Sequence, residues 1–151
     1  MIFTTHIVVG SAVGTFTQNP ALAFLYGLIS HHILDIFPHL DPGSYIKDKY
    51  WKYPKILAII AADLLVGTLI FWWLWKTTDY SWTVFWGALG SVISDIIDNG
   101  PQREVTRKWP GLKQFHAMHH YLHCTIEPQY WYVGILTQLG FIIAGIGIIM
   151  G

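Results

Sequence analysis

The sequence predicts an all-α integral membrane protein, a single multi-spanning domain (residues 1–151) built as a bundle of about five helices. Hydrophobic residues make up 53% of the 151 positions and charged residues only 12%, whereas a soluble domain carries about 25% charged residues. Two apolar stretches are also as long as the roughly 20 residues that a helix needs to cross a bilayer. The composition excludes a water-soluble monomer. It equally excludes a disordered chain, which requires low hydrophobicity and high net charge.

Five apolar stretches are expected to form the helices: residues 7–16, 21–37, 56–75, 81–97 and 129–150. The first two are short and are separated by Gln18-Asn19-Pro20, in which Asn19 suits the cap of a new helix and Pro20 its first turn. We therefore expect two tilted or partly buried helices joined by a tight turn. The segment 99–128 is expected to be a loop.

The charged residues predict an orientation and exclude one class of partner. Nine basic and nine acidic residues cancel, so the chain has no bulk field that would attract nucleic acid. If the five helices alternate in direction, eight of the nine basic residues share one side: Lys47, Lys49, Lys52, Lys55, Arg103, Arg107, Lys108 and Lys113. By the positive-inside rule, that side and the N-terminus face the cytoplasm in a cell-membrane protein.

All eight histidines fall on this same side, near helix ends or in the two basic loops. His31 and Asp35 are four residues apart, so they share a helical face. Asp95 and Asp98 are three apart, on a face that Ser91 and other small residues continue. That face is expected to turn toward the interior of the bundle, and the side chains are expected to converge on one polar site near the cytoplasmic end.

Imidazole and carboxylate together are ligands for zinc, and also for manganese or iron. Asp63 is a further candidate, because a lone acid in the middle of a membrane helix is functional by default. The expected metal ligands are His6, His31, Asp35, Asp63, Asp95, His116, His119 and His120. Asp98 or His32 is expected to transfer protons. His39 and His123, taken singly, fit an interfacial residue as well as a ligand.

So many donors exceed the four of a closed structural zinc site and indicate two or three divalent ions, with zinc first. Adjacent metal ions clamp the oxygens of a phosphoryl group, an arrangement common in phosphoester hydrolysis. A site near the cytosolic interface would reach a membrane lipid as substrate, and basic residues of the 99–128 segment would attract an anionic headgroup.

A resemblance to a known family is carried by four motifs: Thr5-His6, the run Gly27-Leu-Ile-Ser-His31-His32-Ile-Leu-Asp35-Ile-Phe-Pro-His39, the helix end Gly90…Ser94-Asp95, and the histidines His116, His119 and His120. In this order they resemble the membrane-bound metal-dependent hydrolases, small multi-spanning bacterial proteins similar to zinc-dependent phospholipase C. The resemblance implies an all-α fold, phosphoester hydrolysis in a lipid, and metal ligands at His6, His31, Asp35, Asp95 and among the three later histidines. The chain departs from the family's Pro-Asp-Ile-Asp-His-like run at Leu34-Asp35-Ile36.

Two other functions remain open from the sequence. His116-Ala-Met-His119-His120 fits the HxxHH box of di-iron membrane desaturases and hydroxylases, although the further boxes of those enzymes are absent. A metal or proton transporter is favoured by Asp63 in mid-span, but the remaining polar residues gather at one pole instead of lining a path.

Overall fold

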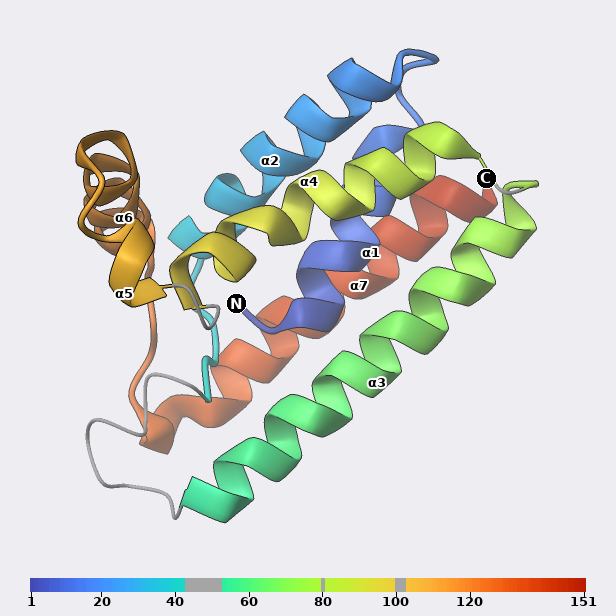
Figure 1. Ribbon diagram of the computed structural model, residues 1–151. Coiled ribbons are helices and arrows are strands. Elements are labelled where there is room, and N and C mark those ends of the chain that lie inside the picture. Colours follow the sequence, from blue (N-terminus) through green and yellow to red (C-terminus); the bar gives the residue numbers. More distant parts are fainter. Residues whose placement is uncertain (43–52, 80, 100–102) are drawn as a thin grey trace.

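The computed structural model describes residues 1–42, 53–79, 81–99 and 103–151, and it is all-helical within these ranges. It has seven α-helices there: α1 (Phe3–Gly14), α2 (Pro20–Ile36), α3 (Tyr53–Thr77), α4 (Trp82–Asn99), α5 (Arg103–Thr106), α6 (Pro110–Leu122) and α7 (Trp131–Met150) (Figure 1). A 3-10 helix, η2 (Pro128–Tyr130), precedes α7. The predicted all-α class is confirmed. Lys47, Lys49, Lys52 and the side chain of Arg103 lie outside the described residues.

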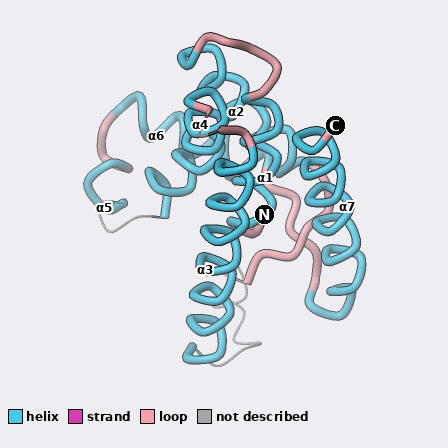
Figure 2. The backbone as a smooth tube through the Cα atoms, turned by 90° about the vertical axis from the view of Figure 1, so that its right-hand side faces the viewer, coloured by secondary structure: helices cyan, strands magenta, loops and turns pink. Residues whose placement is uncertain are grey.

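The short helix α1 lies in the centre of the molecule, among the longer helices (Figures 1 and 2). Its Ile7 and Val8 pack with Leu74 of α3 and with Ala88 and Val92 of α4 to form the apolar core. Nine of its twelve residues are buried. A helix of this length cannot cross a bilayer alone, so its position depends on the helices around it.

Glycines allow α1, α2 and α4 to approach backbone to backbone. A Cβ atom on Gly27 of α2 would lie 2.0 Å from the carbonyl oxygen of Gly87 in α4, and one on Gly87 would lie 2.3 Å from the carbonyl oxygen of Gly10 in α1. Small residues at such positions are the usual means by which helices come close in an apolar environment. The small polar face predicted on α4 is therefore the surface on which α1 and α2 pack.

The predicted turn between the first two helices is confirmed. Asn19 caps α2, because its side-chain oxygen accepts hydrogen bonds from the backbone N–H groups of Ala21 (2.9 Å) and Leu22 (3.3 Å), and Pro20 opens the helix.

The expectation of a loop over residues 99–128 is wrong for most of that segment. It contains α5, α6 and η2, and α5 and α6 lie beside the ends of α2 and α4, outside the bundle of long helices (Figure 1). Pro110 stands at the first turn of α6, the position that proline favours in a helix.

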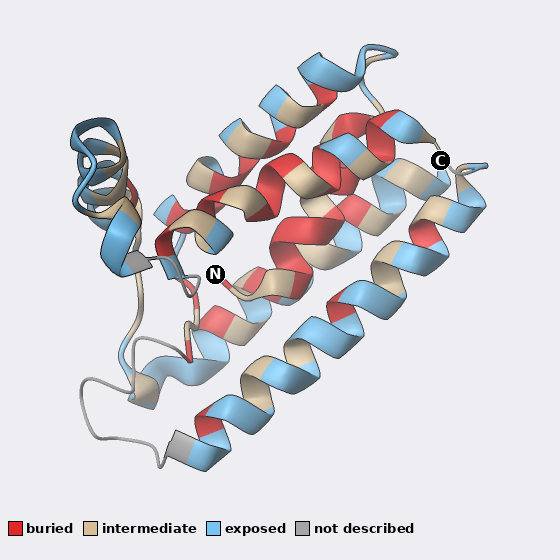
Figure 3. Ribbon diagram, in the orientation of Figure 1, coloured by how far each residue is buried: buried red, intermediate tan, exposed pale blue. Residues whose placement is uncertain are grey.

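Two helical segments, Pro54–Thr77 and Pro128–Met150, are long and apolar enough to cross a membrane. Their apolar side chains are largely exposed: Leu65 and Leu69 on α3, and Leu136 and Ile143 on α7, each keep 60% or more of their surface accessible. In Figure 3, α3 is mostly exposed with only a few buried residues, whereas the buried residues concentrate on α1 and α4. Helices α1 and α2 are apolar but shorter.

We expect Gly27→Ala to lower the thermal stability of the detergent-solubilised protein, because the added methyl group meets the backbone of α4. Overpacking of this kind costs about 1–3 kcal/mol. The matched control is Gly147→Ala in α7, where a Cβ atom meets nothing within 4 Å and alanine favours the helix. Equal melting temperatures for the two variants would contradict the close approach of α2 and α4.

Candidate metal centre

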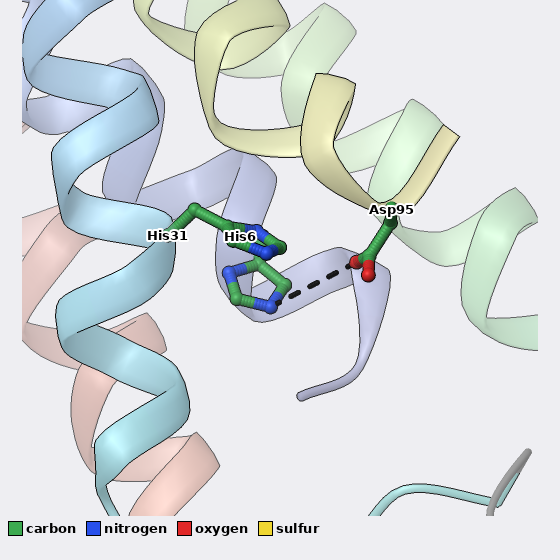
Figure 4. Close-up of side chains that lie close together, drawn as sticks. All are labelled: His6, His31 and Asp95. Atoms are coloured by element: carbon green, nitrogen blue, oxygen red, sulfur yellow. Dashed lines mark ion pairs between the residues drawn. The ribbon is translucent and has the colours of Figure 1, made fainter. Parts of the chain in front are cut away.

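The polar side chains converge at the end of the bundle where α1 begins and where α2 and α4 end. His6 comes from α1, His31 and Asp35 from the last turns of α2, Asp95 from the last turns of α4, and His119 from α6. Figure 4 shows His6, His31 and Asp95 directed toward one another from three different helices. The convergence that the sequence predicts at one pole is therefore present.

Asp35 lies at the middle of this cluster and is fully buried. Five histidine nitrogens lie within 4 Å of its carboxylate oxygens, and every one of them is an Nε2 atom: those of His6, His31, His39, His119 and His123. The shortest of these separations is 3.2 Å, from His119 to Oδ2. The amino group of Met1 also contacts Asp35, at 2.8 Å from Oδ1.

The Nδ1 atoms of two of these histidines are held by backbone carbonyl groups. His31 donates its Nδ1–H to the carbonyl oxygen of Ser91 (2.7 Å), and His39 donates its Nδ1–H to that of Phe37 (2.8 Å). Because a carbonyl oxygen only accepts hydrogen bonds, the neutral form of each ring carries its proton on Nδ1. The Nε2 lone pair of each ring therefore faces the carboxylate of Asp35.

The other nitrogens of His119 and His123 also face polar atoms outside the cluster. His119 Nδ1 lies 3.2 Å from Oδ2 of Asp98, and His123 Nδ1 lies 2.9 Å from the hydroxyl oxygen of Thr125. The contact of His123 is a hydrogen bond, whereas that of His119 is an ion-pair contact without hydrogen-bond geometry. In metal sites the second nitrogen of a histidine is almost always hydrogen-bonded, which sets the tautomer and the ring orientation.

Ring nitrogens this close to one another and to a carboxylate have either a proton or a metal ion between them. The Nε2 atoms of His31 and His119 are 3.2 Å apart, and those of His39 and His123 are 3.3 Å apart. Two ligands at about 2.05 Å from a tetrahedral zinc ion are separated by about 3.3 Å. The spacing of the nitrogens matches that of donors around one metal ion.

Three groups of three residues have donor atoms that all lie within 4.8 Å of one another. They are His6–His31–Asp95, His31–Asp35–His119 and Asp35–His39–His123. Adjacent groups share a residue, first His31 and then Asp35, so the three positions form a continuous row. This buried cluster can hold a metal ion.

Unpaired polar atoms support the same interpretation. Neither ring nitrogen of His6 has a hydrogen-bond partner, although the ring is fully buried. The nearest carboxylate oxygens to His6 Nε2 are those of Asp35 at 3.3 Å and Asp95 at 4.0 Å. A buried polar atom without a partner is costly, and a cation between these residues would remove that cost.

Burial and nearby charges shift the pKa values of His39, His119 and His123. Burial, with the Met1 ammonium and His123 nearby, lowers the pKa of His39 to about 3, and burial also lowers the pKa of His123. Burial opposes the charged form of His119 as well. The carboxylates of Asp35, Asp95 and Asp98 outweigh this effect and raise the pKa of His119.

The structure places Asp63 apart from these groups, at the N-terminus of α1. Its carboxylate accepts hydrogen bonds from the backbone N–H groups of Phe3 (2.7 Å) and Thr4 (3.1 Å) and from the Thr4 hydroxyl (2.6 Å). The first N–H groups of a helix have no partner within it, and a carboxylate also complements the positive end of the helix dipole. Asp63 is therefore the cap of α1, supplied by α3.

The three expected ligands on α6 have different positions. His119 is buried in the cluster, whereas His120 is exposed and is not part of any of the three groups. His116 is half-buried and its Nδ1 contacts the carboxylate of Asp98. The reason is helical geometry: successive residues point about 100° apart, so His119 and His120 cannot share the inner face.

The two residues expected to transfer protons also differ. Asp98 is buried and lies between His116 and His119. His32 lies outside the cluster, against the rings of Phe115 and His119.

The sequence alone left His39 and His123 open between an interfacial role and ligation, and it did not point to the Met1 amino group. A short backbone pairing brings the first two together: the N–H of His39 donates to the carbonyl of Cys124 (3.2 Å), and the N–H of Ile126 donates to the carbonyl of His39 (3.1 Å). The only sequence signal was spacing, since His39 is four residues beyond Asp35 and His123 is four beyond His119.

A pocket of about 550 Å³ lies against the cluster. Its polar lining includes Asp95, Asp98, Arg107, His116 and His119, and α3 contributes the apolar residues Ile59, Ile60 and Leu64 together with Asp63. His32 does not line it. The pocket suits a ligand with a polar end and an apolar end.

No protein-family model matches the chain, and neither a curated protein nor a solved structure shows significant similarity to it. What the site can do therefore follows from its own residues.

We expect Asp63→Ala to lower stability without lowering metal content. Loss of a helix cap costs about 0.5–2 kcal/mol, which corresponds to a fall of a few degrees in melting temperature for a domain of this size. The measurements are thermal unfolding in detergent and elemental analysis after loading with zinc. Metal loss in Asp63→Ala at an unchanged melting temperature would instead make Asp63 a ligand.

Proposed function

We propose that this protein is a membrane-embedded, metal-dependent hydrolase that cleaves a phosphoester of a lipid or lipid-like substrate. The observation that carries the proposal is the set of Nε2 atoms that converge on the buried carboxylate of Asp35. Neutral imidazoles can be held in that arrangement by divalent cations, which neutralise the carboxylate and bind the lone pairs.

The row of three donor groups supports two or three ions. Asp35 belongs to two groups and has two carboxylate oxygens, so it could bind two neighbouring ions, whereas His31, with only Nε2 free, would bind one. The remaining ligands would be His6, Asp95 and His119, together with His39 and His123. Nitrogen and oxygen donors favour zinc, with manganese and iron as the other metals that this set accommodates. Cys124 is exposed and supplies no thiolate to any of the groups.

When bound, such ions lower the pKa of water and neutralise the charge on a phosphoryl group. The protein's own contribution would be to position and to move protons. Asp98 faces the pocket, with His116 and His119 on its two oxygens. It would orient His119 and, with His116, accept a proton at the polar lining of the pocket. His32 does not line the pocket, so we assign proton transfer to Asp98.

A lipid substrate and a membrane location are supported by the surroundings of the pocket. Several of its apolar lining residues belong to α3, which is one of the two helices apolar enough to cross a bilayer. The described basic residues Lys55, Arg107, Lys108 and Lys113 belong to the start of α3 or to the segment from α5 to α6, whereas Lys76 is in the last turn of α3. This asymmetry favours a multi-pass protein with its active site on the cytoplasmic side. The motif resemblance to membrane-bound metal-dependent hydrolases points to the same reaction.

The decisive experiment compares two adjacent histidines of α6. We expect His119→Ala to lose at least one bound metal ion per chain together with phosphate release from lipid phosphoesters, because its Nε2 faces Asp35 and His31. His120→Ala is the matched control and is expected to keep its full metal content, since His120 is exposed and lies outside the donor groups.

Elemental analysis of protein purified without added metal is the measurement, followed by a screen of phosphate release across lipid phosphoesters. Full metal content in His119→Ala and Asp35→Ala would refute the assignment of the site. If the protein contains two iron ions and shows dioxygen-dependent chemistry, it is an oxidoreductase and not a hydrolase. Metal-driven transport in proteoliposomes without turnover would replace it by a transporter.

We expect Asp98→Asn to weaken metal binding without abolishing it. Loss of a residue that orients a metal-binding histidine lowers metal affinity or activity by about 10–100-fold. Titration with a competing chelator measures the affinity. The matched control is Asp79→Asn, at an exposed carboxylate beyond the end of α3 that does not line the pocket; this variant should bind metal as the unmodified protein does. An unchanged affinity in Asp98→Asn would show that Asp98 does not position His119.

A further inference from the structure

Arg107 is the basic residue that lines the pocket. It follows α5 in the chain and is half-buried there. Its Nη2 group donates a long hydrogen bond (3.4 Å) to the backbone carbonyl of Asp98, and its Nε atom is buried without a hydrogen-bond partner. Among the described residues, most of the five N–H donors of this guanidinium group therefore have no partner, and the residue lines the pocket.

The charge of Arg107 also has no counter-ion among the described residues. Within the part of the chain that the structure describes, no carboxylate forms an ion pair with it. The carboxylate of Asp98, whose backbone carbonyl Arg107 contacts, has both oxygens in contact with histidines, Oδ1 with His116 and Oδ2 with His119. A partly buried guanidinium without a counter-ion is energetically unfavourable, and an anion in the pocket would relieve this.

We propose that Arg107 binds the non-bridging oxygens of a phosphate group and so forms the anion subsite of this pocket. Guanidinium groups match phosphate with two parallel hydrogen bonds, which a lysine cannot do. Lys108 and Lys113 are exposed and do not line the pocket, so the sequence neighbours of Arg107 do not share its role. The existence of an anion site is inferred from Arg107 itself. That the anion is a phosphate, and not another oxyanion, rests on the proposed function.

The test measures binding of inorganic phosphate and of phosphatidic acid in detergent micelles, by calorimetry, to the full chain. Diacylglycerol, which lacks the phosphate, is the lipid control. We expect Arg107→Gln to weaken phosphatidic acid binding by about tenfold or more, as for loss of a charge-assisted, bidentate contact. The affinity of Arg107→Lys should lie between those of Arg107→Gln and the unmodified protein. Lys108→Gln should change the affinity less than twofold. Equal elution from a sizing column and equal metal content show that each variant is folded.

The outcomes separate the source of the phosphate. A loss for both ligands assigns the subsite to phosphate in general, whereas a loss for phosphatidic acid alone assigns it to a lipid headgroup. Phosphatidic acid binding by Arg107→Gln at the unmodified affinity overturns the proposal. Failure of the unmodified protein to bind either ligand, or binding of diacylglycerol equal to that of phosphatidic acid, also overturns it.

The same measurements on metal-loaded and on EDTA-treated protein separate this inference from the proposed function. A chain that takes up no metal refutes the hydrolase. In such metal-free protein, the difference in phosphatidic acid affinity between Arg107→Gln and Lys108→Gln still tests whether Arg107 binds the phosphate.

Discussion

The carboxylate of Asp35 is the group around which the polar end of this molecule is organised. It is fully removed from solvent, and an isolated buried carboxylate is far too costly to persist as an ion. Several imidazoles face this carboxylate. In His31 and His39 the Nδ1–H group is donated to a backbone carbonyl, so each presents its Nε2 lone pair to Asp35. Such a site requires positive charge. The Met1 ammonium supplies some of it at 2.8 Å from Asp35, and metal ions would supply the rest.

The polar cluster depends in turn on how closely the helices approach. The backbone contacts of Gly27 and Gly87 hold α2 against α4, which places the Ser91 carbonyl where His31 can donate to it. Asp63 fixes the other side of the site, because it binds the first N–H groups of α1 only a few residues before His6. The geometry of the polar cluster therefore depends on the packing of the apolar part of the bundle.

Local patterns predicted a good part of this arrangement. Asn19-Pro20 has the chemistry of a helix start, and the structure has the helix start there. The spacing of Ser91, Asp95 and Asp98 predicted one inward face of α4; Ser91 and Asp98 are buried there, and Asp95 is half-buried. Asp63 shows the limit of such reasoning. A carboxylate within an apolar helix is expected to meet positive charge, but the sequence does not show whether that is a metal ion or the N-terminus of another helix.

The sequence by itself determined which donors are present and at which end of the bundle they gather, because hydropathy and charge asymmetry act through composition and order alone. Only the tertiary structure decided which nitrogen of each histidine faces Asp35, and which of His116, His119 and His120 enters the cluster. The reason is that those choices depend on partners distant in the chain. His31 is oriented by a carbonyl 60 residues away, and His39 lies beside His123 because the chain after α6 pairs with the chain after α2.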